Sequence, residues 1–532
     1  MPRSEKAGLA LILAACALPI LLGLRWALPG PWHLNTYNCD ENTPVSLLQS
    51  MDPSRLDFNP VGEKTPNALG EGTFNLYTFA ATLKALSVTG ALKLTPDKAF
   101  YYAHPGEWGR VYLAGRAVSA AYGVLALLAV YLLARAMFGP AAAGLAALLL
   151  GLSPAYPVFA RFLVMNTPGM FWIVLSLLLL KRLLDTSSPK FYLLAGAAIG
   201  FAVSTRYSAG PLVLPYAAAW LLNGRPREDL KPALLGVAVM AAAFLAGTPY
   251  ALLDYQSFLR GVRAIAGTVA ADSGAAGPLG GLAAAAASLR SGLGAGLSAV
   301  AAAGLLYSLY RRTKDDLLLA AFVLPMLLIY AKAGAASTEG RMLPVFPFLA
   351  VLAARALADA ARKLPYAAAA AAALLLAELI LYQAAAVRLL LQPDIRDTAS
   401  AWLEANARPG ASIGLLREPS WFSPGVLELD YRHPELGRLR GVRLVPLASG
   451  NWAADAGFDL LAKARPDLVA VTSTEAGYLD EAALGAALAA QGYRPAAEFR
   501  QEFRRPGFPP ARAIPRMLMV QDWVRIYSRK GY

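Results

Sequence analysis

Long apolar runs separated by short polar segments dominate the first 390 residues of the chain. Runs of about 18 or more apolar residues predict membrane-spanning helices, because backbone polar groups in lipid must be satisfied inside the segment. The runs lie at residues 8–28, 111–137, 140–158, 168–184, 191–205, 210–222, 232–250, 284–309, 315–331, 342–361 and 365–388. The pattern therefore predicts a polytopic α-helical membrane protein with about eleven spans, formed by residues 1–390.

Basic residues in the short connections orient these spans. With the N-terminus inside, one side receives the connections LARAMFGP, KRLLDTSSPK, NGRPREDLK, YRRTKDD and ADAARKLP, each with at least one Lys or Arg. Positive residues favour the cytoplasmic side. The first run lacks the short core and small-residue cleavage site of a signal peptide, so we expect it to remain as an anchor. We predict a multi-pass protein of the inner (cytoplasmic) membrane with a cytoplasmic N-terminus.

The stretch 191–222 is long enough for one tilted span or for two short helices. A single span would put two basic connections on opposite sides of the membrane, so we predict a hairpin with STRYSAGP at its tip. About 14 helical residues rise only about 21 Å, less than the hydrocarbon thickness of roughly 30 Å. Arg206 would then lie below the outer surface, where a charge is costly and is a functional candidate by default.

Two predicted outer segments are large. The first runs over residues 29–110 and contains GTFNLYTFAATLKALSVTGAL, an amphipathic stretch that we expect to lie along the membrane interface. The second covers residues 391–532, where the composition changes. There DTASAWLEANARPG and DEAALGAALAAQGY predict helices, and ASIGLL, PDLVAVTS and WVRIYSRK predict strands. This part is expected to be a soluble extracytoplasmic α/β domain.

Composition narrows the classes of partner. Hydrophobic residues make up 57% of the chain and charged residues 16%, and many of the Lys and Arg residues behind the net charge of +14 lie in short loops between apolar runs. No basic helix interleaved with aromatic residues occurs, so we expect a lipid bilayer and no nucleic acid as partner. The two cysteines, Cys16 and Cys39, fall at different depths and are not expected to pair, and three histidines exclude a His-rich metal site.

The first outer segment opens with HLNTYNCDENTP, which places Asp40 and Glu41 about a dozen residues beyond the first span. Near the outer surface such a pair suits a general base that meets a lipid-borne substrate. A solvated acidic turn explains the same two residues. The residues alone leave both interpretations open.

The order of several loose motifs resembles the GT-C superfamily of glycosyltransferases, in particular the branch of the protein O-mannosyltransferases and lipid A aminoarabinose transferases. The matching pieces are CDENT, FNP, YLAGRAVSAAYGVLALLAVYLLARAMFGPAAAGLAALLLGLSPAYPVFARF, AGAAIGFAVSTRYSAGPLVLPY, EGRMLPVFPFLAVLAA and DIRDTASAWLEANARPGASI. The resemblance covers the membrane half from end to end and implies a GT-C-like fold.

The resemblance also implies an inverting transfer of a sugar, hexosyl or pentosyl, from a polyprenyl-phosphate carrier to a hydroxyl on a lipid, glycan or protein acceptor. The first-loop Asp of the family maps onto Asp40, with Glu41 beside it, and would deprotonate or orient the acceptor. The departing lipid phosphate needs cationic stabilisation. The resemblance places Arg206, Tyr207 and Arg341 at the phosphate.

Other outer residues are weaker candidates, because an interfacial cation or a helix cap would explain them equally well. Arg161 and Lys64 are further candidates for the donor phosphate. The candidates for substrate binding are His104, Glu107, Asn166 and Glu339. Where the family commonly has an Asp, this chain has Asn166, so a tightly held metal is not predicted and a divalent cation stays an alternative.

Two other functions compete with catalysis. A transporter or flippase of lipid-linked sugars would often show internal repeats with broken helices and polar sites near the midplane. Here no repeat is visible and polar residues gather on the outer side. A scaffold for envelope assembly would leave Asp40 and Arg206 without a role.

Overall fold

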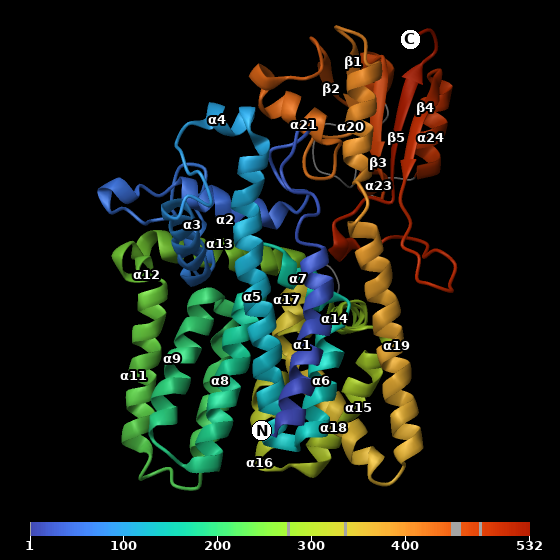
Figure 1. Cartoon of the computed structure of the whole chain (residues 1–532). Helices are drawn as coiled ribbons and strands as arrows, with labels where there is room; N and C mark the ends of the chain where they lie inside the picture. Colours follow the sequence, from blue (N-terminus) through green and yellow to red (C-terminus); the bar gives the residue numbers. More distant parts are fainter. Residues whose placement is uncertain (1, 274–276, 335–337, 448–458, 478–480) are drawn as a thin grey trace. The chain divides into compact units, whose positions relative to one another are not determined.

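The computed structural model describes residues 2–273, 277–334, 338–447, 459–477 and 481–532, which form two compact units. The first unit comprises residues 1–24, 43–89 and 114–383. The second comprises residues 25–42, 90–113 and 384–532, so two segments around the ends of the predicted first outer loop cluster with the C-terminal part. Each unit is described by itself below, and Figure 1 names their elements.

The first unit is helical. Its α-helices are α1 (Arg3–Leu22), α3 (Phe74–Val88), α6 (Pro140–Gly151), α7 (Ala155–Arg161), α8 (Asn166–Thr186), α9 (Lys190–Thr205), α10 (Val213–Leu222), α11 (Leu230–Gly247), α12 (Tyr250–Leu253), α13 (Tyr255–Ser273), α14 (Gly277–Leu293), α15 (Ala295–Arg311), α16 (Lys314–Ala333), α17 (Glu339–Met342) and α18 (Phe346–Ala361). Three helices continue from one unit into the other: α2 (Cys39–Gln49), α5 (Pro105–Phe138) and α19 (Pro365–Leu390). Short 3-10 helices are η1 (Pro53–Arg55), η2 (Ala68–Gly70), η3 (Tyr207–Leu212) and η5 (Leu343–Val345).

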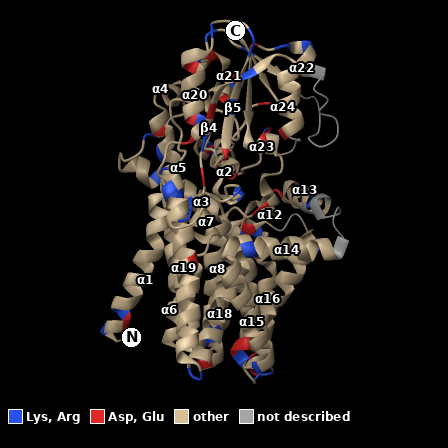
Figure 2. Ribbon diagram, turned by 90° about the vertical axis from the view of Figure 1, so that its right-hand side faces the viewer, with Lys and Arg blue, Asp and Glu red and all other residues tan. Residues whose placement is uncertain are grey.

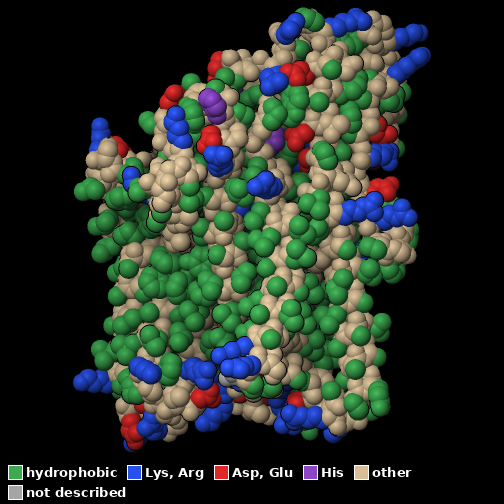
Figure 3. Space-filling view, in the orientation of Figure 1, with side chains coloured by type: hydrophobic (Ala, Val, Ile, Leu, Met, Phe, Trp, Pro, Cys, Tyr) green, Lys and Arg blue, Asp and Glu red, His purple; other side chains and the backbone are tan. Residues whose placement is uncertain are grey.

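Within the described residues, seven helices are long and apolar enough to cross a membrane, or up to nine if each of two bent helix pairs counts as one span. Apolar side chains cover the visible face of the helical unit, and charged ones gather at the ends of its helices (Figure 3). These features support a polytopic helical membrane protein. The number of eleven spans stays a prediction.

Polar contacts join several connections at one end of the helical unit. Lys181 on α8 pairs with Asp315 of α16 at 2.9 Å. The neighbouring Asp316 pairs with Arg355 of α18. Ser187, after α8, donates a hydrogen bond of 2.8 Å to Asn223, after α10. Three of the connections that were predicted to share a side of the membrane therefore share one end of the unit, where Figure 2 shows charged residues gathered.

The same contacts settle the path of residues 190–222. Helix α9 ends at Thr205, the backbone of Arg206 is extended, and η3 and α10 then return the chain to the end at which α9 began. The hydrogen bond between Ser187 and Asn223 joins the two ends of this hairpin. The structure thus has the hairpin that the charge pattern predicted, with Arg206 at its apex.

Two runs that were predicted as continuous spans are broken. The run 284–309 crosses the junction of α14 and α15, which meet at an angle of 116°. Gly294 at the junction has a φ of 91°, which favours glycine, and the Gly296 N–H donates to Glu378 of α19 at 3.2 Å. The run 140–158 contains α6 and α7, bent by 68°. Hydropathy failed to reveal either break, because each pair of helices is apolar enough to pass as one span. At the first break the capping carboxylate also comes from a distant segment.

Small residues bring α9 and α11 together side by side (Figure 1). A Cβ built on Gly196 would lie 2.2 Å from the Gly236 carbonyl oxygen, and one on Gly200 would lie 2.4 Å from that of Met240. Without a hydrophobic drive between helices in lipid, such close backbone approach is a main source of helix association. The pattern Gly196–Gly200 therefore sets the distance between these two helices.

Replacing Gly196 with Leu should push α9 away from α11. Overpacking a tight contact costs about 1–3 kcal/mol, so the midpoint of thermal unfolding in detergent should fall by several degrees, about 5 °C or more. The control is Gly8→Leu in α1, where a Cβ would meet nothing within 4 Å. Equal midpoints for the two variants would contradict this account of the helix contact.

The second unit contains a five-stranded sheet of order β2-β1-β3-β5-β4. Its strands are β1 (Ser412–Leu415), β2 (Arg443–Pro446), β3 (Leu468–Thr472), β4 (Tyr493–Arg500) and β5 (Trp523–Arg529). β1, β2 and β3 run parallel, with Ile413 opposite both Leu444 and Leu468, and β5 and β4 continue the sheet antiparallel. Strands β1, β3 and β5 lie where the sequence predicted strands, whereas β2 and β4 were not foreseen.

Helices cover both faces of this sheet. They are α20 (Ile395–Asn406) and α21 (Gly425–Arg432) in one core cluster, and α22 (Asp459–Ala464), α23 (Ser473–Ala476) and α24 (Glu481–Ala490) in the other. The unit also contains α4 (Lys98–Ala103) and the 3-10 turns η6 (Pro434–Leu436) and η7 (Arg516–Leu518). Successive side chains of a strand point to opposite faces. Leu468 accordingly packs in the cluster with residues of α20 and α21, and Val469 in the one with residues of α22 and α24.

Glu475 is a carboxyl group inside this unit. It is 2% exposed and forms a capping box with Thr472, whose N–H and hydroxyl both donate to Glu475 Oε2 at 3.0 Å. Burial raises the pKa of Glu475 to about 7, because the charged form loses its hydration. The folded protein therefore binds a proton that the unfolded chain releases at lower pH.

The free energy of unfolding should fall as the pH rises from about 4.5 to about 7, by about 3 kcal/mol for this group, and stay level above. Glu475→Gln should remove that part of the pH dependence, measured as the unfolding midpoint at both ends of the range. Glu502→Gln, at an exposed position, is the control and should leave the dependence as it is. A pH dependence that survives in Glu475→Gln would show that other groups cause it.

Candidate active site

The acidic pair opens helix α2, and its two members have different surroundings. The Asp40 side chain is exposed, whereas Glu41 has no exposed surface. Asn38 precedes them and acts as a cap: its Oδ1 accepts the Asp40 N–H at 3.1 Å, and its carbonyl accepts the Glu41 N–H at 3.2 Å. Asp40 is therefore the member of the pair that can meet a substrate.

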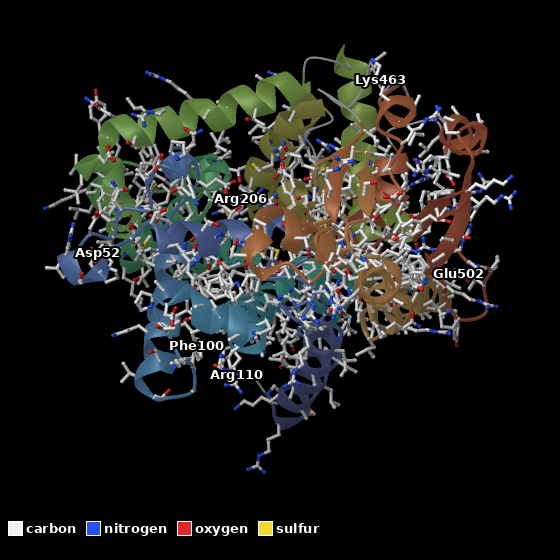
Figure 4. All side chains as sticks on the ribbon, turned by 90° about the horizontal axis from the view of Figure 1, so that it is seen from above. Asp52, Phe100, Arg110, Arg206, Lys463 and Glu502 are labelled. Atoms are coloured by element: carbon white, nitrogen blue, oxygen red, sulfur yellow. The ribbon has the colours of Figure 1, made fainter. Side chains whose placement is uncertain are left out.

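A second group of predicted residues meets around the Gly340 carbonyl in the first unit. Arg206 donates to this oxygen through one terminal nitrogen at 3.0 Å, and Asn166 donates through Nδ2 at 2.7 Å. A Cβ on Gly340 would lie 2.7 Å from Phe159 Cε1 and 2.8 Å from Asn166 Nδ2, so only glycine fits. We call Arg206, Asn166 and Gly340 the Gly340 junction. In Figure 4, Arg206 lies inside the unit, while Asp52 lies at its edge.

Glu339 and Arg341 flank this junction. Both side chains are partly exposed and belong to α17, which begins where Thr338 Oγ1 accepts the Arg341 N–H at 3.5 Å. Tyr330 of α16 donates to the Arg341 carbonyl at 2.7 Å and so fixes the backbone beside Gly340. The structure thus brings together four sequence-predicted residues: Arg206, Asn166, Glu339 and Arg341.

Tyr207 turns away from this group. Its hydroxyl donates to the Leu69 carbonyl at 3.1 Å, and its ring makes edge contact with Phe258 of α13 at 5.8 Å between centroids. These contacts link the hairpin apex to η2 and α13. The two neighbours Arg206 and Tyr207, which the resemblance assigned to one phosphate, therefore have different surroundings.

Arg161 is buried with a partner that sequence reasoning did not single out. Arg116 and Arg161 are 0% and 1% exposed, and each guanidinium lies 5.3 Å from the centre of the Phe162 ring. Arg116 also donates to the Leu24 carbonyl at 2.7 Å. A signal for Arg116 existed: it is a cation within the apolar run 111–137, far from the other one, Arg135 near the end of the run, and such residues are functional candidates by default.

The remaining predicted residues have local or solvent contacts. Lys64 is exposed in the loop before η2. His104 bonds to the Phe100 carbonyl through Nδ1 at 3.0 Å, and Glu107 pairs with Arg110 at 2.7 Å. The Glu107 N–H also donates to the His104 carbonyl at 2.9 Å. These contacts are those of a helix start, the alternative that the sequence left open.

The sequence also left open whether a divalent cation binds at the site. Among the residues that the structure describes, no three His, Cys, Asp or Glu side chains come together in a way that could hold a metal ion. At the junction, Asn166 supplies a neutral amide, and its Nδ2 is already engaged by Gly340.

The predicted site residues are divided between the two units. Asp40, Glu41, His104 and Glu107 belong to the second unit and the others to the first. The shared cavity of Asp40 and Arg206, which the mechanism requires, therefore stays a prediction.

The comparisons with known proteins start from the sequence. Residues 108–250 match the sequence model of the family described as dolichyl-phosphate-mannose-protein mannosyltransferase. That range contains Arg116, Arg161, Asn166, Arg206 and Tyr207. No curated protein matches the chain.

Among solved structures, the chain is similar to ArnT from Cupriavidus metallidurans bound to undecaprenyl phosphate, with 14% identity, 97% of each chain covered and a TM-score of 0.48. It is also similar to the oligosaccharyltransferase AglB from Archaeoglobus fulgidus, with 15% identity, 96% of this chain and 75% of the other covered, and a TM-score of 0.45. The Pmt1–Pmt2 protein O-mannosyltransferase of S. cerevisiae is similar over 48% of this chain and 34% of its own, with 16% identity and a TM-score of 0.33. Over residues 108–250 the chain thus matches the mannosyltransferase family, and the resemblance that the order of its motifs indicated is confirmed.

Proposed function

We propose that this protein is an inverting glycosyltransferase that moves a sugar from a polyprenyl-phosphate carrier to a hydroxyl group of an extracytoplasmic acceptor. The observation that carries the proposal is the match of residues 108–250 to the mannosyltransferase family. The chemistry of the exposed Asp40 and of the Gly340 junction agrees with it. A transporter is less favoured, because the sequence shows no internal repeat of the kind that transporters often have.

Asp40 is the proposed base. Its carboxylate removes the proton of the acceptor hydroxyl as that oxygen attacks the anomeric carbon from the face opposite the phosphate. The new bond joins the acceptor oxygen to the anomeric carbon, and the bond between that carbon and the phosphate oxygen breaks. The electron pair leaves with the lipid phosphate, and the proton stays on Asp40. Glu41, which is fully buried, supports the start of α2 in this scheme.

Arg206 is the proposed partner of the departing phosphate. Its bond to Gly340 uses one of the five N–H donors of the guanidinium, which fixes the group while other donors can face an anion. Arg341, two positions from Glu339 and directly after Gly340, supplies a second cation, and Arg161 and Lys64 are further candidates. A planar guanidinium suits bidentate contact with phosphate oxygens, whose negative charge grows as the bond breaks.

Asp40→Asn should abolish transfer while binding of the lipid carrier survives. An amide cannot accept the hydroxyl proton, and loss of a general base typically costs a factor of about 10²–10⁴ in turnover. Cells that lack the protein are supplied with the wild-type form or with Asp40→Asn, and their envelope glycans and glycoproteins are compared by mass spectrometry. An assay of sugar transfer from candidate polyprenyl-phosphate sugars follows.

The control is Glu63→Gln, an exposed carboxyl group of the same outer segment. It should restore the glycans fully. If Asp40→Asn restores them as well, Asp40 is not the base. If cells with and without the protein have identical glycans and the carrier is only moved across the membrane, the transporter alternative holds.

Arg206→Lys should weaken binding of a polyprenyl phosphate by about tenfold or more, because an ammonium group replaces the fork of donors by a single point charge. The measurement is binding of undecaprenyl phosphate to the detergent-solubilised protein. Arg263→Lys on α13, an exposed position, should leave binding unchanged. Equal affinities for the two variants would remove Arg206 from the phosphate site.

A further inference from the structure

The segment that leads from α1 to the acidic pair is packed into the second unit. Trp26 is 5% exposed, and Trp32 packs against the core cluster on the α20 face of the sheet. A Cβ on Gly425, at the start of α21, would lie 2.9 Å from both His33 Cβ and Tyr37 Oη. Residues 26–37 are therefore part of the fold of this unit and not a loose tether.

Arg396 lies at the centre of these contacts. It has no exposed surface and binds Asp394 with two parallel bonds of 2.7 Å. Its terminal nitrogens also donate to the carbonyls of Trp421 at 2.6 Å and Met519 at 2.8 Å. The edges of the guanidinium are thus fixed by its own domain, and its face lies 3.7 Å from the centre of the Tyr37 ring. Such a cation–π contact is strongest where, as here, water is excluded.

The hydroxyl of Tyr37 completes the contact. It donates to Asp397 Oδ1 at 2.6 Å, the length of a strong charge-assisted bond. His33 Nε2 lies 3.5 Å from the same oxygen, and the His33 and Tyr37 rings stack with 4.3 Å between centroids. We call Asp394, Arg396 and Asp397 the α20 cluster. It holds Tyr37 by the ring and by the hydroxyl at once.

A second anchor lies just after the acidic pair. The Asn42 Oδ1 accepts the Thr36 N–H at 3.2 Å and the Tyr112 hydroxyl at 2.9 Å. The Asn42 amide nitrogen donates back to the Thr36 carbonyl at 3.4 Å. Asp40 lies between Tyr37 and Asn42, three residues after one anchor and two before the other. The backbone that carries Asp40 is therefore held from both sides.

We propose that the α20 cluster is a positioning device of the transferase: by holding Tyr37 it fixes where Asp40 presents its carboxylate. The inference rests on the proposed function in so far as Asp40 is the base. The C-terminal unit then takes part in the reaction itself, beyond any binding of an acceptor. Tyr37, Arg396 and Asp397 act through Asp40 and are positioning residues.

If these contacts served stability alone, a different experimental result would be expected. Loss of a purely structural bond would lower the unfolding midpoint and leave the turnover of the folded fraction unchanged. Loss of a positioning bond would lower turnover in a protein that is still folded, because a displacement of about 1 Å costs about 10²-fold in rate. The two roles are therefore separable with a variant that removes the hydroxyl and keeps the ring.

Cys39 provides a reporter beside Asp40. Burial raises the pKa of its thiol to about 12, so the reactive thiolate is scarce in the folded loop. Tyr37→Phe in the full-length protein should release the loop and raise the rate of labelling of Cys39 by iodoacetamide about fivefold. The rate is read from the Cys39 peptide by mass spectrometry, and Cys16, which is fully buried, is the internal reference. Tyr431→Phe is the control, because it removes an exposed tyrosine hydroxyl of the same unit that interacts with Glu418.

Turnover provides the second readout. Tyr37→Phe should lower kcat about tenfold with the donor KM within about twofold, since the donor is bound as before and the base is displaced. Asp397→Asn keeps an oxygen that can accept the Tyr37 hydroxyl bond. It should therefore stay closer to the wild type than Asp397→Ala in both kcat and Cys39 labelling.

Faster labelling and lower kcat at an unchanged unfolding midpoint would support the positioning role. Unchanged labelling and kcat in Tyr37→Phe would overturn it, as would a lower midpoint without faster labelling of the folded protein. The proposed function fails separately: if Asp40→Asn retains turnover, Asp40 is not the base. In that case the labelling rates still decide whether the α20 cluster holds the loop.

Discussion

The helical unit depends on one constraint: every polar group that is buried away from water needs a hydrogen-bond partner inside the protein. In lipid no water is available to an unpaired N–H, carbonyl or charge, so each break in a helix must be closed from within. Glu378 closes the break before α15 by accepting the Gly296 N–H, and the Gly340 carbonyl accepts bonds from both Arg206 and Asn166. The charges that remain gather at the helix ends, where they pair with each other. One of these places, the Gly340 carbonyl, is also where the candidate residues Arg206 and Asn166 lie.

The predictions from the sequence succeeded where a signal is local. The hairpin over residues 190–222, with Arg206 at its apex, followed from two basic connections that had to share a side. The breaks at Gly294 and between α6 and α7 were missed, since hydropathy over each run is unbroken. At Gly294 the capping carboxylate also lies 82 residues away. Strand β2 was missed because it is four residues long and contains Arg443 and Pro446.

The candidate site divides in the same way. The motif order pointed to Arg206, Asn166 and Arg341, and the structure gathers them around Gly340, a residue whose role as a shared acceptor no pattern shows. The motif order did not predict that the Tyr207 hydroxyl would donate to the Leu69 carbonyl and so lie away from Gly340. The bond between Tyr37 and Asp397 spans 360 residues, so no local rule predicts it. A retrospective signal exists in the motif DIRD, which puts three charges at the start of a helix that packs into a core.

The α20 cluster is hard to explain by stability alone. A buried arginine–carboxylate pair often contributes no more than apolar packing of the same volume, because both charges must leave water. What such a pair does provide is a single geometry: Arg396 is fixed at its edges by Asp394 and two carbonyls, so its face can receive Tyr37 in one position only. A general base needs a single, fixed position, because proton transfer depends on distances of a few tenths of an ångström. We infer that the buried charge of Arg396, although its burial costs free energy, orders the loop that carries Tyr37 and thereby fixes the position of Asp40.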